Sequence, residues 1–256
     1  MDYGLFIKKI GSITGIDLTS YKRPQMERRI NSLMRAQGFH NYLEYLHELQ
    51  KNPVQLEKLL NHLTINVSEF YRNPPQWEVL KTRILPEILK VNPRPKTWSA
   101  GCATGEEPYT LALVLRESVA GPFPRILATD IDERVLAKAR AGIYQEKAVA
   151  NVPKEQLRKY FLQSGDTYQI KDEIKKLVNF QRHDLLKDPF DSFFDLILCR
   201  NVVIYFTEEA KELLYKRFRD ALRPGGVLFT GSTEQIFQAS QLGLEAVASF
   251  FYRRVL

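Results

Sequence analysis

The chain has 256 residues, of which 44% are hydrophobic and 26% charged, with 13 Gly and 13 Pro. This ordinary globular composition excludes a collagen-like, low-complexity or fully disordered chain. The net charge of +7 favours an anionic partner, which could be nucleic acid, a membrane surface or an acidic protein.

Cysteine and histidine usage argues against a disulfide framework and against a metal site. The cysteines are Cys102 and Cys199, and the four histidines show no metal-ligand spacing. We therefore expect buried, reduced thiols and no metal. No apolar run reaches the roughly 18 residues that a membrane span needs, and the N-terminus lacks a signal-peptide pattern. We expect a soluble, cytoplasmic protein that is not inserted in a membrane.

The N-terminal part of the chain is predicted to be helical. One apolar stripe has the spacing i, i+4, i+7, i+8 and comprises Met26, Ile30, Leu33 and Met34. Further helices are expected over residues 42–49 and 56–63. A polar stretch over 65–75 then predicts a partly buried connector. Residues 1–75 are thus expected to form a helical domain and its connector.

Strands and helices alternate over residues 76–256. A helical period from Trp77 to Ile88 is expected to break at Pro86. Strands are predicted at 97–100, 126–129, 178–182, 196–199 and 227–230, and helices at 108–117, 133–141 and 208–222. This alternation predicts an α/β fold, with a parallel sheet and helices on both of its faces. The chain is expected to end in an antiparallel pair of strands, 244–249 and 250–256.

Residues 143–177 interrupt the alternation. They are too many for one loop, so they are predicted to form a small inserted subdomain. We expect a helix over 154–161, a turn at 164–166 and a strand over 168–170.

The strongest local motif is the turn after the first strand, residues 98–108. Gly101 and Gly105 permit close approach of a ligand to the backbone, at the strand end where open α/β sheets bind ligands. The glycine fingerprint of dinucleotide sites and the phosphate loop are both absent. Because Glu106 and Glu107 would repel phosphate, we expect a cationic or neutral ligand. S-adenosylmethionine (SAM) fits this requirement; the alternative is an ordinary turn of an α/β protein.

Polar residues also follow three other strands. Asp130 is placed to accept from ribose hydroxyls, and Asp132 is expected to cap the next helix. Asp184 could accept from the adenine amino group or cap a helix. The Asn201 amide could bind the amino-acid end of the cofactor or satisfy a turn.

The residues after Asn201 bear on the acceptor. Amino N-methylating enzymes of this fold commonly carry an Asn/Asp-Pro-Pro-aromatic tetrad at this position, but here Asn201 precedes two valines. The one Asn-Pro-Pro sequence, residues 73–75, lies elsewhere and precedes Gln76. This pattern argues against a nucleobase amine as acceptor.

A basic cluster lies between residues 20 and 40. It faces one acidic residue, Glu27, and comprises Lys22, Arg23, Arg28, Arg29 and Arg35. Arg28 and Arg35 are expected to share the helix face that points away from the apolar stripe. This face could dock a partner or simply be solvated.

Together these motifs resemble the chemotaxis receptor methyltransferase family, CheR type, whose members methylate chemoreceptor glutamates with SAM. The resemblance covers essentially the whole chain and is carried by residues 63–72, 103–109, 128–132 and 199–206. It implies a class I SAM-dependent methyltransferase: a Rossmann-like, mostly parallel seven-stranded sheet with an N-terminal helical domain and a small inserted β-subdomain.

The resemblance also implies site residues and partners. Arg72 and Tyr205 would lie nearest the transferred methyl group. Contacts to SAM, or to its product S-adenosylhomocysteine (SAH), would come from Asn66, Ser68, Arg72, Gly101, Glu106, Asp130, Asp184, Leu185, Arg200 and Asn201. The partner would be the cytoplasmic helical region of methyl-accepting receptors in membrane arrays, docked through Arg23, Arg28, Arg29 and Arg35, and not nucleic acid.

Members that tether to a receptor C-terminal pentapeptide carry two close glycines in a loop of the inserted subdomain, whereas residues 163–166 contain only Gly165. We therefore expect no dependence on that tether. The alternatives are a SAM enzyme acting on RNA or a small molecule, and a non-enzymatic signalling module that binds SAM. A nicotinamide oxidoreductase is disfavoured because its glycine fingerprint is missing.

Overall fold

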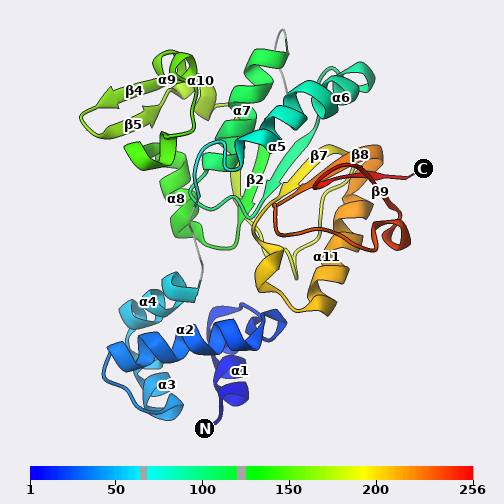
Figure 1. The fold of residues 1–256 in the computed structure, drawn as a ribbon. Helices are drawn as coiled ribbons and strands as arrows, with labels where there is room; N and C mark the ends of the chain where they lie inside the picture. The colour runs from blue at the N-terminus through cyan, green and yellow to red at the C-terminus, as the bar shows by residue number, and fades with distance from the viewer. Residues whose placement is uncertain (64–67, 120–124, 256) are drawn as a thin grey trace. The chain divides into compact units, whose positions relative to one another are not determined.

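The computed structural model describes residues 1–63, 68–119 and 125–255, which divide into two compact units (Figure 1). One unit contains the residues before the first gap together with Tyr205–Glu212; the other contains the remaining described residues. None of the helices in these ranges combines the length and the apolar character that a membrane span requires.

The N-terminal unit is a set of short helices around one core. The helices are α1 (Tyr3–Thr14), η1 (Leu18–Ser20), α2 (Arg23–Ala36), α3 (Tyr42–Lys51) and α4 (Pro53–Leu63). Phe6, Ile10, Ile30 and Tyr45 are fully buried at its centre. Helices this short persist mainly because their apolar faces pack together. The predicted stripe of α2 is confirmed, although Leu33 lies at the edge of the core and is only partly buried.

One segment from late in the chain belongs to this N-terminal unit. Tyr205–Glu212 joins it through an isolated antiparallel bridge between Tyr21 and Phe206. The Lys22 N–H donates to the Tyr205 carbonyl oxygen at 2.8 Å. The sequence alone gave no sign of this pairing, because neither strand of the bridge shows a periodic pattern.

The second unit contains a seven-stranded sheet in the order β6-β2-β1-β7-β8-β10-β9. Its strands are β1 (Thr97–Ala100), β2 (Ile126–Asp130), β6 (Val178–Arg182), β7 (Phe194–Cys199), β8 (Leu222–Thr230), β9 (Leu244–Ala248) and β10 (Phe251–Arg254). The first five strands of that order run parallel, and β10 pairs antiparallel with both β8 and β9. The predicted mostly parallel sheet and closing pair are confirmed.

Helices cover both faces of this sheet (Figure 1). Apolar residues of α5 (Pro74–Val79), α6 (Leu85–Val91), α7 (Glu106–Ser118) and α8 (Glu133–Ala141) share one core with the sheet. On the other face, Phe218 of α11 (Glu208–Ala221) packs against Trp98 of β1, with ring centroids 5.6 Å apart.

The expected break at Pro86 was wrong. The chain stays helical through a π-helical turn, η2 (Leu80–Ile84), in which the Leu85 N–H donates to the Leu80 carbonyl. Proline removes one N–H donor and crowds the preceding turn. A wider turn just before Pro86 relieves that conflict without ending the helix.

The predicted insertion is present and forms its own three-stranded antiparallel sheet, in the order β3-β5-β4. Its elements are β3 (Ile143–Gln145), η3 (Glu146–Val149), α9 (Lys154–Tyr160), β4 (Phe161–Ser164), β5 (Thr167–Ile170) and α10 (Asp172–Lys175). The predicted helix and strand are confirmed as α9 and β5. The strands β3 and β4 were missed, because each is too short to show alternation.

Candidate active site

The turn between β1 and α7 is shaped by close packing at its two glycines. Gly101 and Gly105 both have positive φ, +76° and +94°. A Cβ on Gly101 would lie 2.5 Å from a methyl of Val202, and one on Gly105 would lie 2.9 Å from the Cβ of Ala139. Protein side chains therefore occupy both Cβ directions, and the predicted approach of a ligand to the backbone of this turn stays a prediction. Because glycine tolerates positive φ and has no side chain, the turn can pack closely against Val202 and Ala139. Its backbone therefore lies at the carboxyl edge of the sheet.

Asp130, the last residue of β2, fixes this turn. Its carboxylate accepts from the N–H groups of Ala103 at 2.9 Å and Asp132 at 3.0 Å. Burial raises the pKa of Asp130, while the hydrogen bonds from these amides partly oppose that shift. Each carboxylate oxygen can accept more than one bond, so Asp130 can hold the turn and also accept from a ribose hydroxyl.

Asp132 caps α8, as predicted. Its carboxylate accepts from the Arg134 backbone N–H at 3.0 Å and pairs with the guanidinium of Arg134 at 2.9 Å. The cap fixes the direction in which the chain leaves β2.

Glu106 is the first residue of α7 and is only 4% exposed. The Thr104 hydroxyl lies 2.8 and 2.7 Å from its two carboxylate oxygens, and the Ser68 hydroxyl also hydrogen-bonds to it. Burial raises the pKa of Glu106, and these hydrogen bonds lower it in part. The structure therefore brings together two residues, Ser68 and Glu106, that the resemblance assigned to one site.

The described part of the connector, from Ser68 onward, is anchored by two buried aromatic residues. Phe70 is fully buried and meets the Tyr144 ring edge-on at 4.9 Å. The Tyr71 N–H donates to the Thr110 hydroxyl at 3.1 Å. Asn66, the first predicted cofactor contact, lies outside the described residues.

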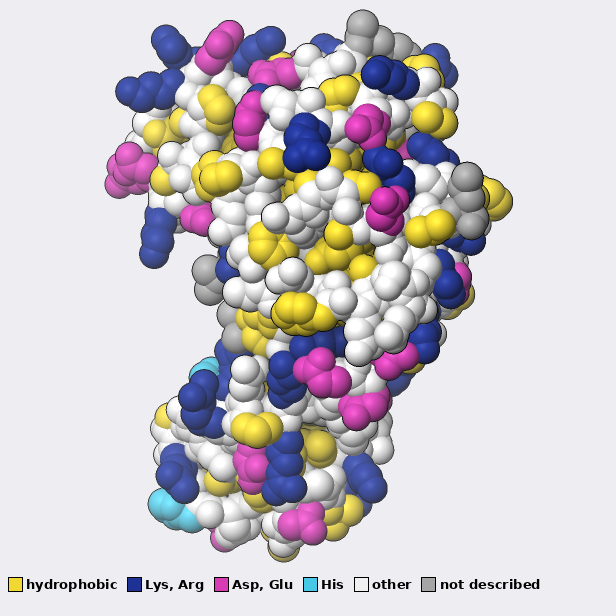
Figure 2. All heavy atoms as spheres, turned by 45° about the vertical axis from the view of Figure 1, so that its right-hand side comes forward, with side chains coloured by type: hydrophobic (Ala, Val, Ile, Leu, Met, Phe, Trp, Pro, Cys, Tyr) yellow, Lys and Arg dark blue, Asp and Glu magenta, His cyan; other side chains and the backbone are white. Residues whose placement is uncertain are grey.

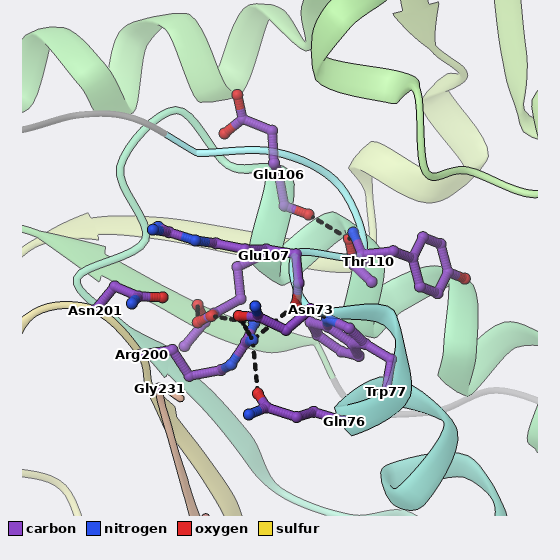
Figure 3. Close-up of polar contacts among 12 residues, drawn as sticks. Asn73, Gln76, Trp77, Glu106, Glu107, Thr110, Arg200, Asn201 and Gly231 are labelled. Carbon is purple, nitrogen blue, oxygen red and sulfur yellow. Dashed lines mark hydrogen bonds and ion pairs between the residues drawn. The ribbon is translucent and has the colours of Figure 1, made fainter. Parts of the chain in front are cut away.

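The Arg200 side chain is buried, and its terminal guanidinium nitrogens contact several neighbouring residues (Figure 3). Its guanidinium donates to the Arg72 carbonyl at 2.7 Å, to Gln76 at 3.0 Å and to Asn73 at 3.2 Å. It also pairs with Glu107 at 3.4 Å. Burial lowers the pKa of Arg200, and Glu107 opposes the shift. The Arg200 side chain thus ties the connector to the end of β7, and its predicted contact to the cofactor remains a prediction.

Glu107 completes this buried ion pair. Its second oxygen accepts from the Ser99 hydroxyl at 2.8 Å. Burial raises the pKa of Glu107, while Arg200 lowers it. A buried pair of this kind fixes geometry more than it adds stability, because desolvation offsets much of the Coulomb attraction.

Asn201 has an unusual backbone and an unsatisfied side chain. Its φ is +60°, in the left-handed region that is uncommon for residues other than glycine. Its Oδ1 atom is buried and has no hydrogen-bond partner among the described residues. An orphaned acceptor is costly unless a donor reaches it. The ammonium group of SAM is such a donor, and the neighbouring buried carboxylates suit a cation.

Strained backbone gathers at this edge of the sheet. Six non-glycine residues of the described chain have positive φ, and four of them belong to the turns discussed here: Tyr71, Asn73, Ala103 and Asn201. Each such residue costs of order 1–3 kcal/mol and persists only when its surroundings enforce it. This concentration supports a functional assignment for the edge.

The turn after β6 carries the remaining predicted contacts. The Asp184 carboxylate accepts from the Leu186 N–H at 2.9 Å, and the Leu185 carbonyl accepts from Arg217. Asp184 thus closes a local turn with one oxygen. Its contact to adenine remains a prediction.

One buried acid at this edge was missed. Glu234 lies shortly after β8, is 4% exposed, and accepts backbone N–H bonds from the loop that contains Asn201. A carboxylate after a strand was the same signal that identified Asp130, so residues 227–234 could have revealed it.

The basic residues of the N-terminal unit fall into different environments. Arg28 and Arg35 are exposed, as predicted. Arg23 pairs with Glu27 at 2.9 Å, whereas Arg29 is partly buried and lies near Tyr205. Figure 2 shows Lys and Arg side chains recurring over this unit, in the lower part of the view, with acidic and hydrophobic side chains among them. The exposed pair, Arg28 and Arg35, is therefore the part of the cluster best placed for docking.

The described residues contain no group of three or more His, Cys, Asp and Glu side chains that could hold a metal. Cys102 and Cys199 are both buried, and burial raises the pKa of each thiol.

A mostly parallel sheet with a glycine turn after β1, an aspartate at the end of β2 and buried acids at the same edge is an open α/β fold that binds ligands at that edge, and it fits the class I SAM-dependent methyltransferases. Residues 66–249 match the family described as "CheR methyltransferase, SAM binding domain", and residues 1–64 match "CheR methyltransferase, all-alpha domain". The chain belongs to the CheR methyltransferase family, and SAM is its methyl donor.

Curated relatives agree with this assignment. A "Chemotaxis protein methyltransferase" of Listeria innocua is 42% identical over 98% of this chain and 96% of its own length. One from Borreliella burgdorferi is 38% identical over 90% of this chain and 86% of its own. A TehB-like SAM-dependent methyltransferase from Corynebacterium glutamicum aligns over 71% of this chain and 93% of its own, with 17% identity and a TM-score of 0.40. That last likeness is too distant to bear on function.

Proposed function

We propose that this protein methylates glutamate side chains in the cytoplasmic helical region of methyl-accepting chemotaxis receptors, giving methyl esters and SAH. The observation that carries the proposal is the 42% identity to a chemotaxis protein methyltransferase over 98% of this chain. The matches to both CheR family domains and the exposed arginines of α2 add support.

The reaction needs alignment more than acid–base chemistry. The sulfonium of bound SAM supplies an electrophilic methyl group, and one carboxylate oxygen of the acceptor forms the new C–O bond as the C–S bond breaks. A glutamate carboxylate is already ionised at neutral pH, since its free pKa is about 4.3, so no general base is required. Alignment and exclusion of water can together contribute roughly 7–11 kcal/mol.

We assign the protein residues as follows. Arg72 and Tyr205 act nearest the methyl group: Arg72 orients the acceptor carboxylate or the cofactor, and Tyr205 donates a hydrogen bond. An arginine that gripped the acceptor too tightly would lower its nucleophilicity, so positioning the cofactor is an equally good role for Arg72. The cofactor is bound by Asn66, Ser68, Arg72, Gly101, Glu106, Asp130, Asp184, Leu185, Arg200 and Asn201, and the Arg200 side chain also ties the connector to the end of β7.

The protein is expected to be cytoplasmic and to meet its acceptor where it is recruited to receptor arrays at the membrane. The exposed Arg28 and Arg35 side chains suit an acidic helical surface. The loop between β4 and β5 consists of Gly165 and Asp166 and therefore has one glycine, whereas members that tether to a receptor pentapeptide have two close glycines in such a loop. We therefore expect no requirement for a receptor pentapeptide.

Product chemistry tests this proposal. The protein is incubated with methyl-labelled SAM and receptor-containing membranes, and the product is treated with mild base. We expect label in the receptor band that is released as methanol, because carboxyl methyl esters hydrolyse in base. Base-stable label on RNA or on a small molecule would support the alternative enzyme. Absence of transfer at saturating SAM would support a SAM-binding module without turnover.

A further inference from the structure

The Glu234 carboxylate collects backbone N–H groups from two strand ends. It accepts from Asn201 at 2.6 Å, from Gly231 at 2.8 Å and from Ile204 at 3.3 Å. A further backbone bond comes from Val202. One carboxylate therefore accepts from three backbone N–H groups of the loop that follows β7, and it links that loop to Gly231 at the end of β8.

Gly231 allows this close arrangement. A Cβ at Gly231 would lie 2.5 Å from the Glu234 Oε2 and 2.8 Å from the Asn201 nitrogen. Neither distance is compatible with a side chain there. The Glu234 carboxylate and the Asn201 backbone nitrogen thus both pack against Gly231, just after β8 (Figure 3 shows Gly231 and Asn201).

The loop needs an anion at this position. Four backbone N–H groups converge on the carboxylate, one of them buried and the others partly buried, and a buried donor without a partner is costly. An amide in place of Glu234 would turn an NH₂ group toward some of these donors. Asn201 would then lose the contact that holds its left-handed backbone and directs its orphaned Oδ1.

We infer that Glu234 is a positioning residue for the methyl donor, holding residues 201–204 so that the Asn201 amide oxygen meets the cationic amino-acid end of SAM. The inference rests on the proposed role of Asn201 as a cofactor contact. Glu234 itself touches neither the cofactor nor the acceptor, and its effect passes through the loop.

Asp195 provides a matched control. It is also a buried carboxylate, 1% exposed, but it lies at the opposite end of β7. It accepts from Asn92 and from the Lys96 N–H, both at 2.8 Å, and pairs with Arg223. Asp195→Asn therefore removes a comparable buried anion at the opposite end of β7, away from the site.

The test compares Glu234→Gln, Asp195→Asn and the unmodified protein. Calorimetry measures the Kd for SAM, thermal melting measures stability, and hydrogen exchange follows the amides of Asn201, Val202 and Ile204. We expect Glu234→Gln to weaken SAM binding by about tenfold or more, the usual scale for a charged hydrogen bond, and to speed exchange in the loop. Asp195→Asn should lower the melting temperature to a similar extent with a Kd within about twofold of the unmodified protein.

Two results would overturn the inference. The first is a Glu234→Gln variant that binds SAM as tightly as the unmodified protein. The second is an Asp195→Asn variant that loses affinity equally, which would make the effect one of general stability. Failure of the unmodified protein to bind SAM would instead refute the proposed function, and the inference with it.

Discussion

Tyr21 and Phe206 pair across an antiparallel bridge, and the centroids of their rings lie 4.8 Å apart. The bridge holds the residue next to Tyr205 against the start of the basic helix α2. The Lys22–Tyr205 backbone hydrogen bond, at 2.8 Å, reinforces it. The helix proposed to dock the receptor and the tyrosine proposed to act at the methyl group thus belong to one compact unit.

This relationship predicts the effect of Phe206→Leu. The smaller side chain should loosen Tyr205, lowering kcat for receptor methylation about tenfold through misalignment, and should leave the Kd for SAM unchanged. Methyl-transfer assays and calorimetry check the two quantities. Phe6→Leu, in the core of the same unit, is the control and should lower stability without that loss of kcat. Equal kcat for the two variants would contradict the prediction.

Arg72→Ala should keep the fold but lose most turnover. The contacts that Arg200 and Trp77 make here use the Arg72 backbone carbonyl, which alanine retains. Loss of a charged group near the reacting atoms typically lowers kcat by about 10²–10³-fold. Circular dichroism checks the fold and a radiolabelled methyl assay checks turnover. Near-normal turnover in a folded variant would end the assignment.

Reversing Arg28 and Arg35 to Glu should weaken receptor methylation while sparing SAM affinity. Both side chains are exposed, so the change acts on encounter with an acidic partner and should raise KM. The control reverses Lys8 and Lys9, two exposed residues of α1, with the same change in net charge. The docking role is refuted if both double variants lose methylation equally, or if SAM binding falls in parallel.

The raised pKa of Glu106 predicts opposite pH effects on binding and on stability. Ionised Glu106 favours a cation, so SAM affinity should fall as pH decreases through the raised pKa, beginning above the ordinary value of 4.5. The stabilising effect of the same shift is present in full below pH 4.5 and is lost as pH rises through the folded-state pKa. Glu106→Gln should flatten both profiles, measured by calorimetry and thermal melting across pH. Profiles as steep as those of the unmodified protein would show that Glu106 is not the group responsible.

The alternating strands and helices could be predicted because each carries a local signal. The strands β1, β2 and β7 are short, largely buried runs, and Gly101, Asp130 and Arg200 lie at or directly after their ends, which parallel strands place at one edge. Asp132 was identified as a helix cap from its position alone, and it is the N-cap of α8, which begins at Glu133. These features are determined by residues close to one another in the sequence, so the local sequence pattern predicts them.

Features that depend on distant contacts could not be predicted. The pairing of Tyr21 with Phe206 and the burial of Arg200 beneath the connector join residues far apart in the chain. Filling of the space beside Gly101 by Val202 is likewise a tertiary effect. At Pro86, a π-helical turn accommodates the proline without ending the helix, and the apolar spacing alone does not reveal such a turn.

The most direct test of the central claim is a crystal structure of this protein with SAH. We predict that SAH lies over the turn between Gly101 and Gly105, with its ribose on Asp130 and its amino group within hydrogen-bonding distance of the Asn201 Oδ1. Ligand density elsewhere, with this turn and Asp130 left bare, would contradict the account.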